Sequence, residues 1–147
     1  MFPYITEDTS IKVGDYAIVS SKEVKLLGIV IDNKLTFVSH IKDLCTKALR
    51  KAKSLMRIRS YLSQDQTNHI FNAFILPSFQ YCPLVWMFCS KSAQTMIEKT
   101  HHKLLRIQFN SFSHSYLKLL EMDDTMDIHT KNLRLLVVET FFSSIHP

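Results

Sequence analysis

Residues 39 to 59 place a strong constraint on the fold, because their apolar and basic side chains separate onto opposite sides of a helix. Drawn at about 100° per residue, the apolar side consists of Ile41, Leu44, Cys45, Ala48, Leu49, Ala52, Leu55 and Met56. The basic side consists of Lys42, Lys47, Arg50, Lys51, Lys53 and Arg57. Ser39 is the expected N-cap, and Ile58 and Arg59 depart from the pattern where we expect the helix to end. A helix of this kind needs other elements to cover its apolar side.

Short strands are predicted before this helix. Ile11 to Val19 reads as two strands around a Gly14-Asp15 turn. Val24 to Ile31 reads as a third strand, too apolar on both faces to be half exposed. Gly28 in this strand fits a packing or bulge glycine, or a backbone that comes close to a ligand. Two or three strands cannot close a core alone, so the ribbon has to pack on another part of the protein.

A second helix is predicted after the basic one. Ser63 and Gln66 have the spacing of a capping box, so the helix should begin here and run toward Leu76. Pro77 and Pro83 then interrupt a run rich in aromatic residues. Because proline removes an interior helical hydrogen bond, this run predicts either a kinked helix or two short helices.

Three more helical segments follow, opening near Ser92, at Ser115 and after Thr125. Asp123 and Asp124 are expected to place negative charge at the start of the last helix. Only two glycines occur among 147 residues, which argues against a barrel or sandwich. The predicted fold class is mainly α, with a small N-terminal β ribbon of two to three short antiparallel strands at about 11–31 and then a bundle of about four to five helices.

Positive charge is concentrated in the middle of the chain. Residues 39 to 112 carry eleven basic and three acidic side chains, whereas the whole chain has a net charge of +5. A basic segment between mildly acidic ends indicates a polyanionic partner, nucleic acid before a membrane surface. The alternative is a basic helix face that is merely solvated.

Other classes of site find little support. The three cysteines, Cys45, Cys82 and Cys89, form no Cys-x-x-Cys pair, no signal peptide is recognisable, and no apolar run is long enough to span a membrane. We therefore expect reduced structural thiols and an intracellular protein. His101 and His102 diverge on a helix and lack a cysteine half-site, so neither a metal site nor a cofactor is expected. No motif for a nucleophile or a phosphate loop is present, and no small-molecule ligand is expected.

Three groups of residues resemble the part of non-LTR (LINE-type) retrotransposon reverse transcriptases where the palm gives way to the thumb. The first group consists of Lys25, Leu27, Gly28, Asp32, Leu35, Thr36, His40 and Ile41. The second consists of Leu76, Pro77, Tyr81, Cys82, Val85 and Trp86. The third consists of Ile97, Glu98, Leu105, Arg106 and Ile107. The order of these groups along the chain makes the resemblance specific as a set.

The resemblance implies that residues 1–38 are a remnant of the palm end and residues 39–147 a helical thumb-like and post-thumb region. Lys25, Leu27 and Gly28 would then be primer-grip-like residues. Lys42, Lys47, Arg50, Lys51, Lys53 and Arg57 are the candidate nucleic-acid contacts. Tyr81 and Trp86 read as buried core aromatics, with base stacking as the alternative.

Polymerisation by this chain alone is not expected. The family's catalytic Tyr-x-Asp-Asp hairpin lies before the primer grip, whereas Asp123-Asp124 lies after it and has Glu121 in place of the tyrosine. The hypothesis is a fragment without catalytic residues that at most binds nucleic acid non-specifically. The rival hypotheses are a small helical protein-interaction module and a non-functional remnant of a mobile element.

Overall fold

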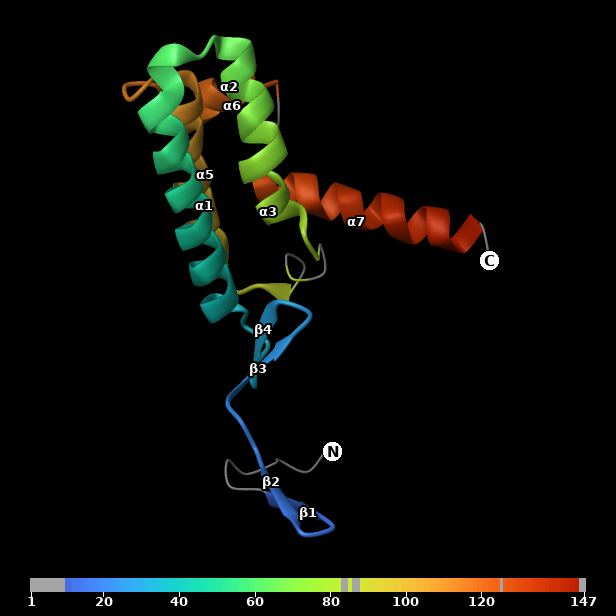
Figure 1. Cartoon of the computed structure of the whole chain (residues 1–147). Helices are drawn as coiled ribbons and strands as arrows, with labels where there is room; N and C mark the ends of the chain where they lie inside the picture. Colours follow the sequence, from blue (N-terminus) through green and yellow to red (C-terminus); the bar gives the residue numbers. More distant parts are fainter. Residues whose placement is uncertain (1–9, 83–84, 86–87, 125, 146–147) are drawn as a thin grey trace.

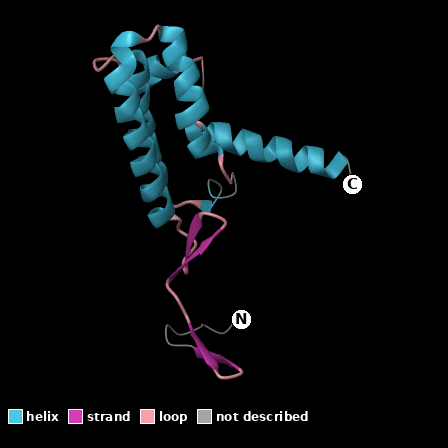
Figure 2. Cartoon of the chain, viewed as in Figure 1, coloured by secondary structure: helices cyan, strands magenta, loops and turns pink. Residues whose placement is uncertain are grey.

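The computed structural model describes residues 10–82, 85, 88–124 and 126–145. Two β-hairpins at the N-terminal end lead into a helical bundle, and a final helix leads away from that bundle (Figures 1 and 2). The described chain is mainly helical, and both sheets lie at its N-terminal end. The predicted fold class is therefore confirmed. No helix among the described residues is long and apolar enough to cross a membrane.

The first hairpin pairs β1 (Ser10–Val13) with β2 (Tyr16–Val19) in an antiparallel register that places Ile11 opposite Ile18. Gly14 has a φ of 61° and makes the predicted turn with Asp15. Every residue of both strands is exposed. The apolar side chains of this hairpin therefore have no cover within the described part of the chain.

The second hairpin corrects the prediction of one strand from Val24 to Ile31. The structure has two strands here, β3 (Glu23–Leu26) and β4 (Ile29–Asp32), paired antiparallel. Leu27 and Gly28 form the turn between them, with φ values of 48° and 88°. A two-residue turn with two positive φ values matches the twist of a hairpin, but leucine is an uncommon residue there, so the sequence read as continuous strand.

The core lies between α1 (Val38–Ile58) and α5 (Lys91–Phe109), which run side by side in Figure 1. The predicted apolar side of α1 is confirmed, apart from Met56, which is exposed. The core side chains of α1 and α5 that are fully buried include Ile41, Ala48, Ala52, Ala93, Ile97 and Leu104. Burial of this shared apolar surface is the main stabilisation available to the bundle.

The start of α1 differs from the prediction. The N-cap position belongs to Phe37, with a φ of 56°, and Ser39 lies in the first turn, where its hydroxyl donates to the Glu23 carboxylate. Asp32 fixes this entry, because its carboxylate accepts hydrogen bonds from the backbone N–H groups of Lys34, Thr36 and Phe37 and from the Thr36 hydroxyl. The residue that organises the helix start therefore comes from β4.

After α1 and η1 (Arg59–Tyr61) the chain reverses through the extended residues Leu62 and Ser63 and is then helical from α2 (Gln64–Ile70) to α3 (Pro77–Gln80) (Figure 1). Between these two helices lies the π-helical turn η2 (Phe71–Ile75). The capping box of Ser63 and Gln66 is confirmed. Pro77 occupies the first turn of α3, where its missing N–H costs little. Pro83 lies outside the described residues.

The last two helices are α6 (Tyr116–Met122) and α7 (Ile128–Ile145). Ser115 caps α6, near the predicted start, and Ser90 rather than Ser92 caps α5. The expected placement of Asp123 and Asp124 at the start of the last helix needs correction, because Asp123 is the C-cap of α6 and α7 begins only at Ile128. The Asp127 carboxylate accepts from the Thr130 N–H at 2.9 Å instead, because Asp127 lies directly before the helix.

Candidate nucleic-acid groove

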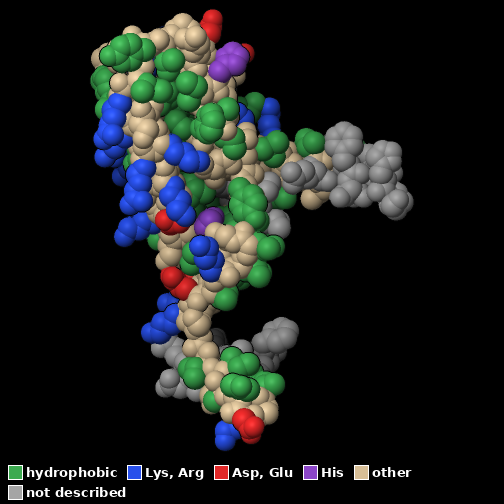
Figure 3. Space-filling model, viewed as in Figure 1, with side chains coloured by type: hydrophobic (Ala, Val, Ile, Leu, Met, Phe, Trp, Pro, Cys, Tyr) green, Lys and Arg blue, Asp and Glu red, His purple; other side chains and the backbone are tan. Residues whose placement is uncertain are grey.

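All six basic residues predicted on α1 are exposed, and Lys and Arg side chains gather along this side of the bundle in Figure 3. They divide into two sets. Lys47, Arg50 and Lys51 line a groove beside α1, whereas Lys42, Lys53 and Arg57 lie outside it. The structure thus brings three of the predicted residues together in one hollow.

The groove has a volume of about 420 Å³ and lies between three parts of the fold. The second hairpin contributes Gly28, and the segment around α3 contributes Ser78 and Tyr81. Helix α1 contributes the remaining lining residues, His40, Asp43, Leu44, Lys47, Arg50 and Lys51. Three cationic side chains and one carboxylate line this hollow, so its charge favours an anionic ligand.

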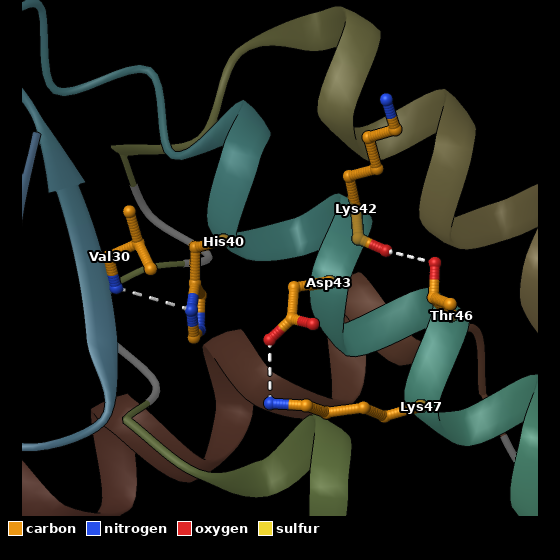
Figure 4. Close-up of polar contacts among 6 residues, drawn as sticks. All are labelled: Val30, His40, Lys42, Asp43, Thr46 and Lys47. Carbon is orange, nitrogen blue, oxygen red and sulfur yellow. Dashed lines mark hydrogen bonds and ion pairs between the residues drawn. The ribbon is translucent and has the colours of Figure 1, made fainter.

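Direct hydrogen bonds fix the second hairpin beside α1. The Val30 N–H donates to His40 Nδ1 at 3.4 Å, and His40 points from α1 toward β4 in Figure 4. Burial lowers the pKa of His40, which favours the unprotonated ring that this acceptor role requires. Burial opposes the charged form of Asp32, but hydrogen bonds from Thr36 and Phe37 keep the pKa of Asp32 below its usual value.

Tyr81 corrects the prediction of a buried aromatic. It is 55% exposed, and its hydroxyl donates to the Leu27 carbonyl at 2.8 Å. The neighbouring Phe79 is the aromatic that enters the core, with 1% exposure. Trp86, the other aromatic of this prediction, lies outside the described residues. Tyr81 therefore links the hairpin turn to the helical segment across the groove.

The groove cations differ in their partners. Lys47 pairs with Asp43 at 2.6 Å, as Figure 4 shows, and Lys42 extends to another side of α1. The hydrogen bond from Lys47 and the nearby charge of Lys25 lower the pKa of Asp43, in spite of some desolvation. This ion pair is exposed on both sides, so it contributes little stability and leaves Lys47 open to a competing anion.

Lys51 and Arg50 occupy different situations at the groove. The Lys51 ammonium donates to the Phe74 carbonyl at 2.8 Å and to the Ser78 hydroxyl at 2.9 Å, so it also joins α1 to η2 and α3. The Arg50 guanidinium has no hydrogen bond or ion pair with any residue that the structure describes. Arg50 is thus the groove cation that retains its full bonding capacity.

The three residues predicted to be primer-grip-like, Lys25, Leu27 and Gly28, all lie at or near this groove. Gly28 lines it, the Leu27 carbonyl accepts from Tyr81, and Lys25 lies near enough to Asp43 to affect its pKa. No described atom comes within 4 Å of the position of a Cβ on Gly28. The positive φ of the hairpin turn, rather than close packing within the chain, accounts for this glycine.

The cysteine, histidine and aspartate residues considered for nucleophilic or metal chemistry are buried or hydrogen-bonded within the fold. Burial raises the pKa of the Cys45 and Cys89 thiols, which disfavours the reactive thiolate. His101 is 2% exposed and hydrogen-bonded to the Tyr116 hydroxyl, and burial lowers its pKa to about 4. Asp123 accepts from the Gln108 amide at 2.8 Å. Among the described residues, no group of three or more His, Cys, Asp or Glu side chains is placed to hold a metal ion.

A larger hollow of about 730 Å³ lies between α6 and α7. Its lining carries equal numbers of acidic and basic side chains, Glu121 and Asp124 against Lys131 and Arg134. The rest of its lining is apolar and consists of Leu117, Leu120, Met126, Leu135 and Val138. Without an excess of positive charge, this hollow is less suited to a polyanion than the groove beside α1.

The sequence placed three polar residues of the site in the matched motifs but did not indicate the contacts that they make between elements. His40 and Asp32 attach the second hairpin to α1. Tyr81, directly after α3, bonds to the turn of the same hairpin. All three lie within the matched motifs, at the ends of predicted elements. Helical periodicity alone cannot find contacts between elements that lie far apart in the chain.

Comparison with known proteins shows a similarity to a polymerase from a transposon. The chain is 27% identical over 116 residues to the probable RNA-directed DNA polymerase from transposon X-element of Drosophila melanogaster. The aligned part covers 72% of this chain and 13% of that polymerase, so the chain spans a small part of its relative. No family model and no solved structure matches the chain. The similarity supports a reverse-transcriptase-like origin for the chain.

Proposed function

We infer that this chain is the palm-end and thumb part of a non-LTR retrotransposon reverse transcriptase, and that it binds nucleic acid non-specifically through α1. The similarity to the X-element polymerase supports the origin. The observation that carries the binding function is the groove, where Lys47, Arg50 and Lys51 lie opposite the turn at Gly28. Lys42, Lys53 and Arg57 extend the same positive surface along α1.

Phosphate contacts fit this surface better than base readout. Its six exposed side chains are all lysine or arginine, and such side chains contact phosphate oxygens without reading the base sequence. Lysine and arginine that neutralise phosphates release counterions, so affinity falls steeply with salt and depends little on sequence. With roughly four phosphates neutralised, the slope of log K against log salt on a duplex should be about −3 to −4, with Kd of about 10⁻⁴ to 10⁻⁶ M at physiological salt.

The decisive variant replaces Arg50, Lys53 and Arg57 by glutamine. Each lost phosphate contact should reduce the slope by about one, so the triple variant should flatten it by about two to three. Glutamine is nearly as good a helix former as lysine or arginine, so helix content measured by circular dichroism should not change. Binding is measured by fluorescence anisotropy with labelled duplex and single strand between 50 and 200 mM salt, about the range over which phosphate-driven binding falls steeply.

A matched control removes the same charge elsewhere. Lys12, Lys91 and Lys103 are exposed and lie off α1, so their replacement by glutamine changes the net charge equally. This control should change the slope by less than about one unit, because only the general field of the protein is weakened. If both triple variants bind like the parent across this salt range, the basic face is merely solvated and the interaction-module hypothesis replaces this one.

We expect no DNA synthesis by this chain alone. Nucleotide addition needs carboxylates that hold two metal ions at the growing strand, and the sequence lacks the Tyr-x-Asp-Asp hairpin of the family. The test is extension of a primed RNA or DNA template with Mg²⁺ or Mn²⁺. Template-dependent extension above a control without protein would contradict the proposal of a fragment without the catalytic palm.

A further inference from the structure

Tyr81 has two properties that a core aromatic lacks. More than half of the residue is exposed, at 55%, and it lines the groove that also contains Gly28 and Arg50. Its hydroxyl is held by the Leu27 carbonyl at 2.8 Å, at the hairpin turn. An aromatic ring that is fixed at one end and exposed over much of its surface offers a preorganised platform for stacking.

Arg50 supplies the second part of a binding site. Its guanidinium has no polar partner among the described residues, whereas Lys47 pairs with Asp43 and Lys51 bonds to Phe74 and Ser78. A free guanidinium presents several N–H donors that match the oxygens of a phosphate. The volume of the groove, about 420 Å³, lies in the range of pockets that hold small ligands.

We propose that this groove holds one unpaired nucleotide of a bound strand, with its base stacked on Tyr81 and its phosphate at Arg50. The proposal rests on the proposed function and adds a specific preference to it. In the interior of a duplex, each base is already stacked on its neighbours, so only an unpaired nucleotide can offer a free face to the ring. Stacking on an aromatic side chain tolerates any base, which agrees with binding that has little sequence preference.

The test compares two single strands with equal numbers of phosphates. One is a thymidine oligonucleotide, and the other is a strand of the same length made of abasic sites. The parent chain should bind the thymidine strand about fivefold or more tightly than the abasic strand, as expected for one stacked base. Both strands should show the same slope of log K against log salt, because they carry the same phosphates.

Three variants of the full chain assign this difference to named groups. Tyr81→Leu should bring the ratio of the two affinities close to one. Tyr81→Phe should lower the ratio but keep it above one, because the ring remains although the hydroxyl bond to Leu27 is lost. Arg50→Gln should weaken binding of both strands equally and leave the ratio unchanged. Circular dichroism of each variant checks that helix content is retained, and the ratio in the parent chain tests the proposal without any substitution.

Two results would overturn the inference: a parent ratio of one, or a ratio that survives Tyr81→Leu. These failures differ from failure of the proposed function. Equal, strongly salt-dependent binding of both strands would remove the nucleotide site and leave the phosphate-binding face of α1. Absence of salt-dependent binding to either strand would remove both proposals.

Discussion

The two hairpins of this chain have strands of equal length and two-residue turns, but they differ in their attachment to the helices. Every strand residue of the first hairpin is exposed, whereas β4 of the second is half buried. The second hairpin is held by Asp32 at the start of α1, by the Val30 bond to His40 and by the Tyr81 bond to Leu27. Packing of Ile29 and Ile31 on the core and specific polar bonds to the bundle, rather than strand propensity, therefore distinguish the second hairpin from the first.

The first hairpin carries an exposed apolar face. On its pairing register, one face carries Ile11, Val13, Tyr16 and Ile18, all of them exposed. The sequence already indicated that such a ribbon must pack on another part of a protein. Under the proposed origin, this apolar face would pack on the palm of the polymerase.

The largest expected difference in the free energy of unfolding is between two isoleucine variants, one at the start of α1 and one in the first hairpin. Ile41 is 0% exposed in the first turns of α1, and Ile18 is 58% exposed in β2. Ile41→Ala should lower the free energy of unfolding by about 2 to 5 kcal/mol, through lost burial and a residual cavity. Ile18→Ala should change it by less than about 0.5 kcal/mol. Urea unfolding followed by circular dichroism checks the pair, and equal effects would mean that the first hairpin is also packed.

The next difference concerns one aspartate in each hairpin region. Asp32→Ala removes the acceptor for three backbone N–H groups and one hydroxyl, and should cost about 1.5 to 3 kcal/mol. Asp15→Ala in the first turn is the matched control and should cost less than about 0.5 kcal/mol. The same urea experiment measures both. A small effect of Asp32→Ala would show that the entry into α1 does not depend on this carboxylate.

The smallest expected difference is a response to pH. The pKa of His40 is lowered by burial in the folded state, so the unfolded state binds a proton more readily. Stability from this residue is therefore present at neutral pH and lost as the pH falls below the ordinary histidine pKa of about 6.5. Amide exchange of Val30, whose N–H bonds to His40, should quicken in that range relative to its intrinsic rate, and amides of the first hairpin should not. His40→Asn should remove the dependence at Val30, and an unchanged dependence in that variant would assign it to another group.

Much of the fold could be predicted from the sequence, because local patterns determine local structure. The apolar side chains of α1 recur at helical spacing, and the capping box pairs Ser63 with a glutamine three residues later. The structure confirms both. The start of α1 could not be predicted in this way. Ser39 has the composition of an N-cap, but Asp32 reaches the same backbone from β4 and leaves Ser39 in the first turn.

The candidate site was predictable only in part. Helical spacing identified the exposed cations of α1, and the motif singled out Gly28, which lines the groove. It did not indicate that Lys51 would bond to the Phe74 carbonyl or that Tyr81 would be exposed, because both depend on how distant segments meet. Leu27 illustrates the same limit, since its φ of 48° follows from the hairpin rather than from leucine's own preference.

The most direct test of nucleic-acid binding through α1 is a map of the protein surface that the nucleic acid contacts. A titration of the labelled protein with a short duplex, followed by ¹H–¹⁵N correlation spectra, reports which backbone amides feel the nucleic acid. Binding through α1 predicts shifts along α1 from Lys47 to Arg57 and at the turn of Leu27 and Gly28, and none in the first hairpin from Ser10 to Val19. Shifts confined to the first hairpin or to α7, with α1 unchanged, would contradict it.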